Sequence, residues 1–131
     1  MTIEWLPLEA VLIIHAEQLD EHGGAPGIRD EGLLRSALAR PQNLLAYQPE
    51  AGLARLAACY AYGIARNHAF VDGNKRVALL TAYGFLALNG QLLDATNREA
   101  ERMVMRLAAG EMDEPDFAEW IDRNLVPIQD R

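Results

Sequence analysis

Apolar residues recur at intervals of three and four in nearly every apolar segment of this chain. This spacing places them along one face of an α-helix, whereas a half-buried strand would alternate apolar and polar residues. The segment Asn74–Leu88 is apolar on almost every side, which is typical of a helix inside a domain. We therefore predict an all-α fold, a compact bundle of about six helices around this buried central helix, with no substantial sheet.

Capping residues and helix breakers predict where the helices begin and end. Asp30 is a good N-cap for a helix over Glu31–Ala39, which we expect Pro41 to end. Two amides, a tyrosine and a proline then predict an irregular flap over Gln42–Glu50. Three further helices are predicted over Leu8–Glu21, Ala51–Asn67 and Asn74–Leu88. A fifth helix begins at the capping box Thr96–Glu99 and runs to near Ala109. The sixth has Pro115 in its first turn, and its residues Phe117, Trp120 and Ile121 face inward.

Length and composition narrow the class of protein. The 131 residues suffice for a single domain over 1–131 and are too few for two. The net charge of −7 argues against direct binding of nucleic acid. The longest apolar run is too short to cross a bilayer, and the start shows no signal peptide, so we expect a cytoplasmic protein without membrane contact. Cys59 stands alone in an apolar run, which predicts a buried thiol.

The stretch from His68 to Arg76, His-Ala-Phe-Val-Asp-Gly-Asn-Lys-Arg, stands directly before the predicted central helix. The free N–H groups and the dipole at a helix N-terminus favour an anion. Histidine can take a proton from a hydroxyl near neutral pH. Aspartate is a hard oxygen ligand suited to Mg²⁺. The pattern predicts phosphoryl or nucleotidyl transfer.

Each of these residues also has an ordinary structural explanation. Asp72 or Asn74 can act as an N-cap, and Asp72 can form a helix-surface ion pair with Arg76. A plain cap needs one polar side chain, however, and this stretch supplies five. We therefore predict the following roles: His68 as the catalytic base, Asp72 as the metal ligand, Phe70 as the residue that positions the loop, and Arg66, Gly73, Asn74, Lys75 and Arg76 as the nucleotide- and phosphate-binding residues. For Arg66, compensation of its own helix's C-terminal dipole is an equally good explanation.

The motif resembles that of the Fic/Doc superfamily, whose wider form reads His-Pro-Phe-x-x-Gly-Asn-Gly-Arg-x-x-Arg. Ala69 replaces the proline, Lys75 the second glycine and Leu79 the final arginine. The stretches Gly27–Leu34 and Ser36–Pro41 also look like the N-terminal half of Doc-type toxins. A lysine at the glycine position is typical of the Doc ("death on curing") branch. The resemblance implies transfer of phosphate, rather than of AMP, from ATP with Mg²⁺.

The resemblance further implies the toxin of a type II toxin–antitoxin system that phosphorylates a Ser or Thr hydroxyl of a translation protein, with elongation factor Tu as the family precedent. In self-inhibiting Fic proteins a Ser or Thr precedes an inhibitory glutamate by four residues, and no Ser or Thr of this chain does so. The resemblance therefore implies a Phd-like antitoxin as the partner that restrains the toxin. Two alternatives stay open: a protein nucleotidyltransferase of the same fold (AMPylation), and a non-catalytic helical interaction module. Lys75 and Leu79 favour the kinase over the nucleotidyltransferase. His68 and Asp72 favour either enzyme over the module.

Overall fold

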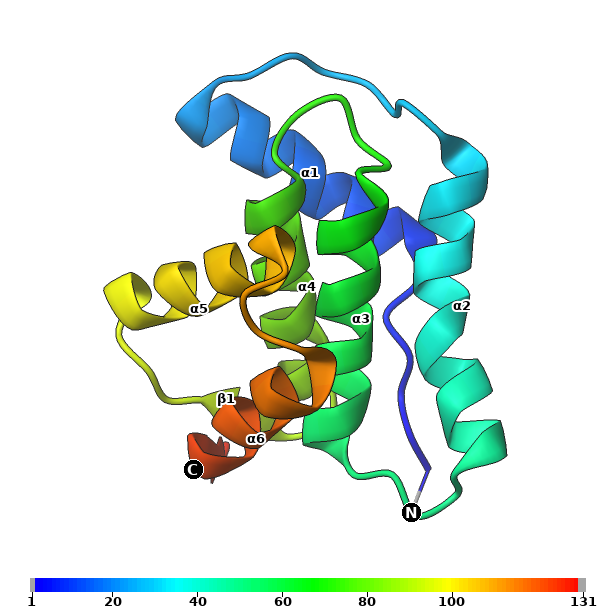
Figure 1. Cartoon of the computed structure of the whole chain (residues 1–131), viewed down its shortest axis with the longest axis vertical. Coiled ribbons are helices and arrows are strands. Elements are labelled where there is room, and N and C mark those ends of the chain that lie inside the picture. The colour runs from blue at the N-terminus through cyan, green and yellow to red at the C-terminus, as the bar shows by residue number, and fades with distance from the viewer. Residues whose placement is uncertain (1, 130–131) are drawn as a thin grey trace.

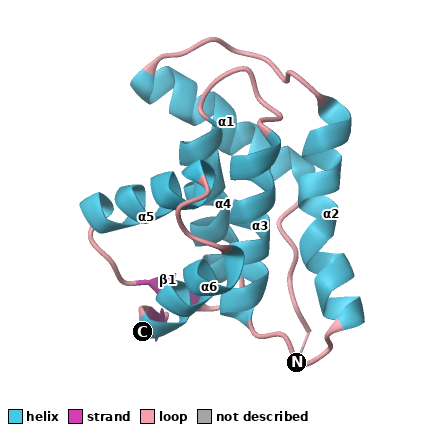
Figure 2. Cartoon of the chain, viewed as in Figure 1, coloured by secondary structure: helices cyan, strands magenta, loops and turns pink. Residues whose placement is uncertain are grey.

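The computed structural model describes residues 2–129, and within them it confirms the all-α fold (Figures 1 and 2). The helices are α1 (Leu8–His22), α2 (Glu31–Tyr47), α3 (Leu53–Asn67), α4 (Asn74–Leu88), α5 (Asn97–Ala109) and α6 (Glu114–Arg123). Two short strands, β1 (Gln91–Leu93) and β2 (Leu125–Pro127), form an antiparallel pair in which Leu92 lies opposite Val126. No helix in the described part of the chain has the length and apolar character that crossing a membrane requires.

The most buried helix is α3, which runs through the middle of the bundle (Figure 1). It packs against α2, α4, α5 and α6, and its buried residues are mostly alanines and other small side chains. A Cβ atom on Gly63 would lie 3.1 Å from the Cα of Ala37 in α2, so these two helices are in close contact. We predicted α4 as the central helix, and it is indeed buried along much of its length. The centre of the bundle is nevertheless the pair α3 and α4, and α3 has ten buried residues whereas α4 has seven.

The extent of α2 differs from the prediction. The helix continues through Pro41 to Tyr47, so the predicted end at Pro41 and the predicted flap over Gln42–Glu50 are both wrong. A proline in a helix interior removes one hydrogen bond and costs about 3 kcal/mol relative to alanine. Here the proline is buried, and Leu44 and Leu45 beyond it pack against the core. Burial of this last part of the helix offsets the local penalty.

Side-chain caps begin three helices, and two of these caps, Asp30 and Thr96, are predicted by the sequence. Asp30 caps α2, Thr96 caps α5 and Asp113 caps α6, each through a hydrogen bond of 2.9 to 3.1 Å. Pro115 lies in the first turn of α6, which buries the side chains predicted to face inward, those of Phe117, Trp120 and Ile121. The start of α4 is different, because its N-cap is Gly73, in the left-handed conformation, which has no side chain to offer.

The predicted buried thiol of Cys59 is confirmed. The residue lies inside α3, and burial raises the pKa of its thiol to about 12. A thiol with so high a pKa stays protonated at neutral pH and is a poor nucleophile. We therefore assign Cys59 to packing.

The loop between α3 and α4 lies at one end of the molecule, where the segment 23–30 between α1 and α2 runs beside it (Figure 1). Ile28 and Phe70 form an isolated antiparallel bridge between the two. The backbone N–H of Val71 donates to the carbonyl of Gly27 at 3.1 Å, and that of Arg29 donates to the carbonyl of Ala69 at 2.7 Å. The segment 23–30 thus holds the loop that carries the motif.

Candidate active site

His68 ends α3 in an unusual backbone conformation. It has φ 51° and ψ 47°, and it is the only non-glycine residue with a positive φ in residues 2–129. This left-handed conformation costs about 1–2 kcal/mol for a residue with a side chain. Such strain persists only where the surroundings impose it, and it concentrates at functional sites. Its side chain is exposed and lines a cleft.

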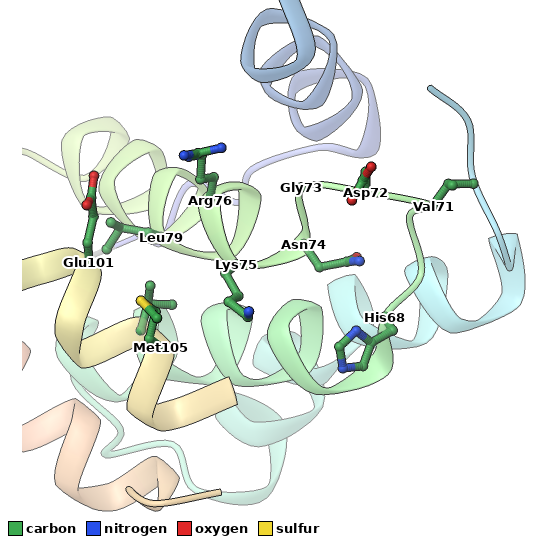
Figure 3. A pocket seen from close by; sticks show the side chains of 11 residues that line it. His68, Val71, Asp72, Gly73, Asn74, Lys75, Arg76, Leu79, Glu101 and Met105 are labelled. Carbon is green, nitrogen blue, oxygen red and sulfur yellow. The ribbon is translucent and has the colours of Figure 1, made fainter. Parts of the chain in front are cut away.

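The cleft has a volume of about 450 Å³, which is within the usual range for a small-molecule site. It lies between the motif loop, the first turns of α4 and one face of α5 (Figure 3). The motif side supplies His68 and the polar start of α4. The far side is more apolar, and its residues are Leu79 from α4 and Glu101, Val104 and Met105 from α5. The cleft therefore has a polar end and a largely apolar end.

The polar end is the N-terminus of α4. Gly73 is its N-cap with φ 81°, a conformation that strongly favours glycine. Within the described residues, the N–H groups of Gly73, Asn74 and Lys75 donate no backbone hydrogen bond, and no side chain caps the helix. These three groups are free to bind an anion, as the sequence predicts.

The Asn74 side chain has a different task from its backbone. Its Nδ2 donates to the Phe70 carbonyl at 2.9 Å, and its Oδ1 accepts from the Phe70 N–H at 3.0 Å. This paired contact closes the loop on itself. Asn74 can therefore offer an anion its backbone N–H, while its side chain fixes the loop.

Lys75 and Arg76 leave α4 in opposite directions (Figure 3). Both residues line the cleft, but Lys75 extends on the side of α4 where His68 lies, whereas Arg76 extends on the other side of the helix. Both are exposed, and neither forms an ion pair with any of residues 2–129. Lys75 is therefore the cation better placed to act beside the histidine.

Asp72 lines the cleft, and its Oδ2 accepts a hydrogen bond of 3.0 Å from the N–H of Ala25. Among the described residues, no three His, Cys, Asp or Glu side chains gather as a ready-made metal site. Mg²⁺ is often held by one or two carboxylates together with substrate phosphates and waters. A single carboxylate beside an anion-binding helix end fits that second kind of site.

Arg66 lies outside the cleft. Its Nη1 donates to the carbonyl of Ala108 at 3.3 Å, near the end of α5, and its guanidinium lies 6.0 Å from the ring centre of Tyr62. The arginine thus links α3 to the C-terminal end of α5, where a cation is favourable. The structure therefore places Arg66 apart from the other residues that the sequence predicts to bind the phosphates.

His15 supports the loop from α1 and was not predicted. Phe70 is buried, as a loop-positioning residue should be, and its ring stacks on that of His15 with centres 3.9 Å apart. The Nε2 of His15 lies 2.9 Å from the Asp72 carbonyl, at hydrogen-bond distance. In the sequence, His15 looks like one more interior position of an apolar helix, and nothing there indicates a contact with the motif.

Arg29 is the second supporting residue that the sequence did not single out. Its guanidinium donates from Nε to the His68 carbonyl at 2.7 Å and from Nη2 to the Asn67 carbonyl at 3.1 Å. The stretch Gly27–Leu34 contains it, and the resemblance of that stretch to Doc-type toxins was the only available signal. The cleft residues Glu101 and Met105 gave none, because α5 has the pattern of an ordinary amphipathic helix.

Comparison with known proteins agrees with this geometry. The family model described as Fic/DOC matches residues 5–86, which include the motif. The chain is 33% identical over 116 residues to "Protein kinase doc" of Escherichia phage P1, an alignment that covers 88% of this chain and 90% of that protein. It is 48% identical over 75 residues to "Toxin Doc" of Mycolicibacterium smegmatis, covering 56% of this chain and 57% of that protein. The chain therefore belongs to the Fic/DOC family, and the relatives it resembles are Doc proteins.

Proposed function

We propose that this protein is the toxin of a type II toxin–antitoxin system and a protein kinase. It transfers the γ-phosphate of ATP to a Ser or Thr hydroxyl of a translation protein, for which elongation factor Tu is the family precedent. The observation that carries the proposal is the cleft in which His68 and Lys75 flank the uncapped N-terminus of α4. The similarity to a protein named as a kinase supports phosphate as the transferred group.

The two ends of the cleft suit the two ends of ATP. The free N–H groups at the start of α4 bind the terminal phosphate, and Lys75 neutralises charge beside it. The nucleoside lies toward the apolar wall of Leu79, Val104 and Met105. Asp72 and phosphate oxygens together would hold Mg²⁺, which would shield the negative charge of the triphosphate.

His68 acts as the general base in the transfer. Its imidazole takes the proton of the acceptor hydroxyl while the hydroxyl oxygen forms a bond to the γ-phosphorus. The bond from that phosphorus to the β–γ bridging oxygen breaks, and ADP leaves with the electron pair. The imidazolium then returns its proton to solvent. A general base of this kind typically contributes about 10²–10⁴-fold in rate.

Protein nucleotidyl transfer is the second candidate, because the same histidine and the same helix end would serve an attack on the α-phosphorus. Two residues of the cleft disfavour it. Lys75 occupies the position of the motif's second glycine, and apolar Leu79 lines the cleft where the wider motif has an arginine. The third candidate, a non-catalytic module, does not explain why His68 has a strained backbone conformation.

The test is incubation with elongation factor Tu and Mg·ATP labelled in either the α- or the γ-phosphate. We expect label on the protein from γ-labelled ATP only, loss of transfer in His68→Ala, and loss of phosphate transfer in Lys75→Gly. Incorporation of α-label by the wild type would replace the kinase with the nucleotidyltransferase. No label from either ATP in the wild type would favour the module, and wild-type transfer by His68→Ala would contradict the role of His68 as the base.

A toxin of this kind needs restraint by another chain, and we propose a Phd-like antitoxin. Three large apolar side chains at or beside the cleft are exposed, those of Ile28, Val71 and Met105, and a covering segment would bury them. Because residues 42–47 are helix and not a flap, the expected contact lies on the motif loop and its neighbours. Hydrogen exchange in the complex should show protection there, and a footprint confined to the opposite end of the bundle would contradict this.

A further inference from the structure

We propose that Arg29 is a positioning residue, which sets the backbone at the end of α3 so that His68 holds its imidazole in the cleft. The inference rests on the proposed function, because the position of His68 affects catalysis only if His68 is the base. Arg29 itself is not among the residues that line the cleft. Its effect must therefore pass through the backbone.

Arg29 binds three successive carbonyl groups. Its side-chain Nε donates to His68 at 2.7 Å and its Nη2 to Asn67 at 3.1 Å. Its backbone N–H donates to Ala69 at 2.7 Å. One residue from a distant segment thus fixes the peptide groups on both sides of the catalytic histidine.

The end of α3 needs such a partner. The last carbonyls of a helix have no N–H donors within it, and a cation is favourable beside them. A left-handed residue at this place is usually glycine, whereas here it is His68. If the carbonyl of His68 turned away to relieve the strain, the 2.7 Å bond to Arg29 would be lost. Arg29 therefore stabilises the conformation from which the imidazole projects.

The backbone that carries the Arg29 side chain is itself held in place on both sides. Ile28 before it pairs with Phe70, and Asp30 after it caps α2 through the N–H of Leu33. The planar fork of an arginine can reach two carbonyls at once, while a lysine presents a single nitrogen. The Nε and Nη2 atoms of Arg29 point at main-chain carbonyls, and Arg29 does not line the cleft where a phosphate would bind.

The experiment compares Arg29→Gln and Arg29→Lys in the full chain with Arg35→Gln as matched control. Arg35 lies on α2 in an exposed ion pair with Glu31, so its substitution removes the same charge and no contact with the loop. We expect kcat for γ-label transfer to fall about 10–100-fold in Arg29→Gln, the size of effect seen when a residue that orients a metal-binding side chain is lost. KM for ATP should change little, because Asn74 and Gly73 hold the phosphate-binding end. Arg29→Lys should recover only part of kcat, and Arg35→Gln should match the wild type.

A readout independent of activity is the NMR signal of the His68 ring, assigned by its loss in His68→Ala. Arg29→Gln should shift or broaden that signal, and Arg35→Gln should not. Wild-type kcat and an unchanged ring signal in Arg29→Gln would overturn the proposal. If Arg29→Gln does not fold, a folded Arg29→Lys with wild-type kcat would also overturn it, and a reduced kcat would support it. If the wild type transfers no label yet Arg29→Gln moves the His68 signal, the kinase proposal fails while the positioning of His68 by Arg29 stands.

Discussion

His15 contributes to the site through two contacts that substitutions can separate. His15→Phe keeps the stacking on Phe70 and loses the hydrogen bond to the Asp72 carbonyl, so the free energy of unfolding should fall by about 1 kcal/mol. His15→Ala loses both contacts and leaves a cavity, so the loss should be about 2 kcal/mol or more. Urea unfolding measures both values. His22→Ala, at the exposed end of α1, is the control and should change little. If His15→Ala were no worse than His22→Ala, the support that we assign to His15 would be absent.

Contiguous residues of the site could be predicted from the sequence, and distant ones could not. Asp72, Gly73 and Lys75 stand in one loop and one helical turn, so their spacing alone brings them together. His15 is 57 residues from Asp72, and only the packed fold shows that they touch. Arg66 is close to His68 in the sequence, but its side chain contacts the end of α5 instead of the cleft, and the sequence does not show this contact.

At the scale of elements, local signals predicted helix starts better than helix ends. Asp30 and Thr96 cap their helices as expected, because a cap depends on a few neighbouring residues. Pro41 was expected to end α2, but the cost of the proline is local, whereas the burial that offsets it comes from the rest of the fold. The strands β1 and β2 have three residues each, too few for an alternating pattern to show in the sequence.

Two glycines inside helices should respond oppositely to alanine. Alanine favours a helix interior over glycine by about 1 kcal/mol. At Gly84 a Cβ would meet only Leu6, at 3.7 Å, an ordinary contact, so Gly84→Ala should stabilise the protein. At Gly63 a Cβ would lie 3.1 Å from the backbone of Ala37, so α2 and α3 would have to separate, and Gly63→Ala should destabilise it. Thermal unfolding of the two variants compares the signs. A gain of stability in Gly63→Ala would contradict the close contact of these helices.

At the scale of the whole molecule, periodicity was enough to predict the fold class but not the order of burial. The apolar character of α4 suggested the centre, yet α3, with its many small side chains, has ten buried residues and α4 has seven. The charged residues are also distributed unevenly over the molecule. The chain carries a net charge of −7, while the start of α4 presents Lys75 and Arg76 without ion pairs in the described part of the protein. These two cations favour an anionic ligand at this place although the net charge of the chain is negative.

Binding of Mg·ATP at the N-terminus of α4 should raise the free energy of unfolding of the whole domain. A ligand that binds only the folded state adds about 2.7 kcal/mol at a concentration of 100 times its Kd. In a domain of this size that corresponds to a rise in Tm of several degrees. Thermal unfolding should show a larger rise with Mg·ATP than with AMP, because in the proposed function the terminal phosphate binds the helix N-terminus. EDTA should reduce the rise in the wild type, and Asp72→Asn should remove that effect of EDTA.

His68→Ala is the control for this measurement, since it should lose transfer but keep the rise in Tm. Equal shifts for ATP and AMP would mean that the helix N-terminus does not bind the terminal phosphate. A full effect of EDTA in Asp72→Asn would mean that Asp72 does not hold the metal. Because the two results concern different atoms of the site, either can fail alone, and the failure would show which half of the phosphate-binding arrangement is wrong.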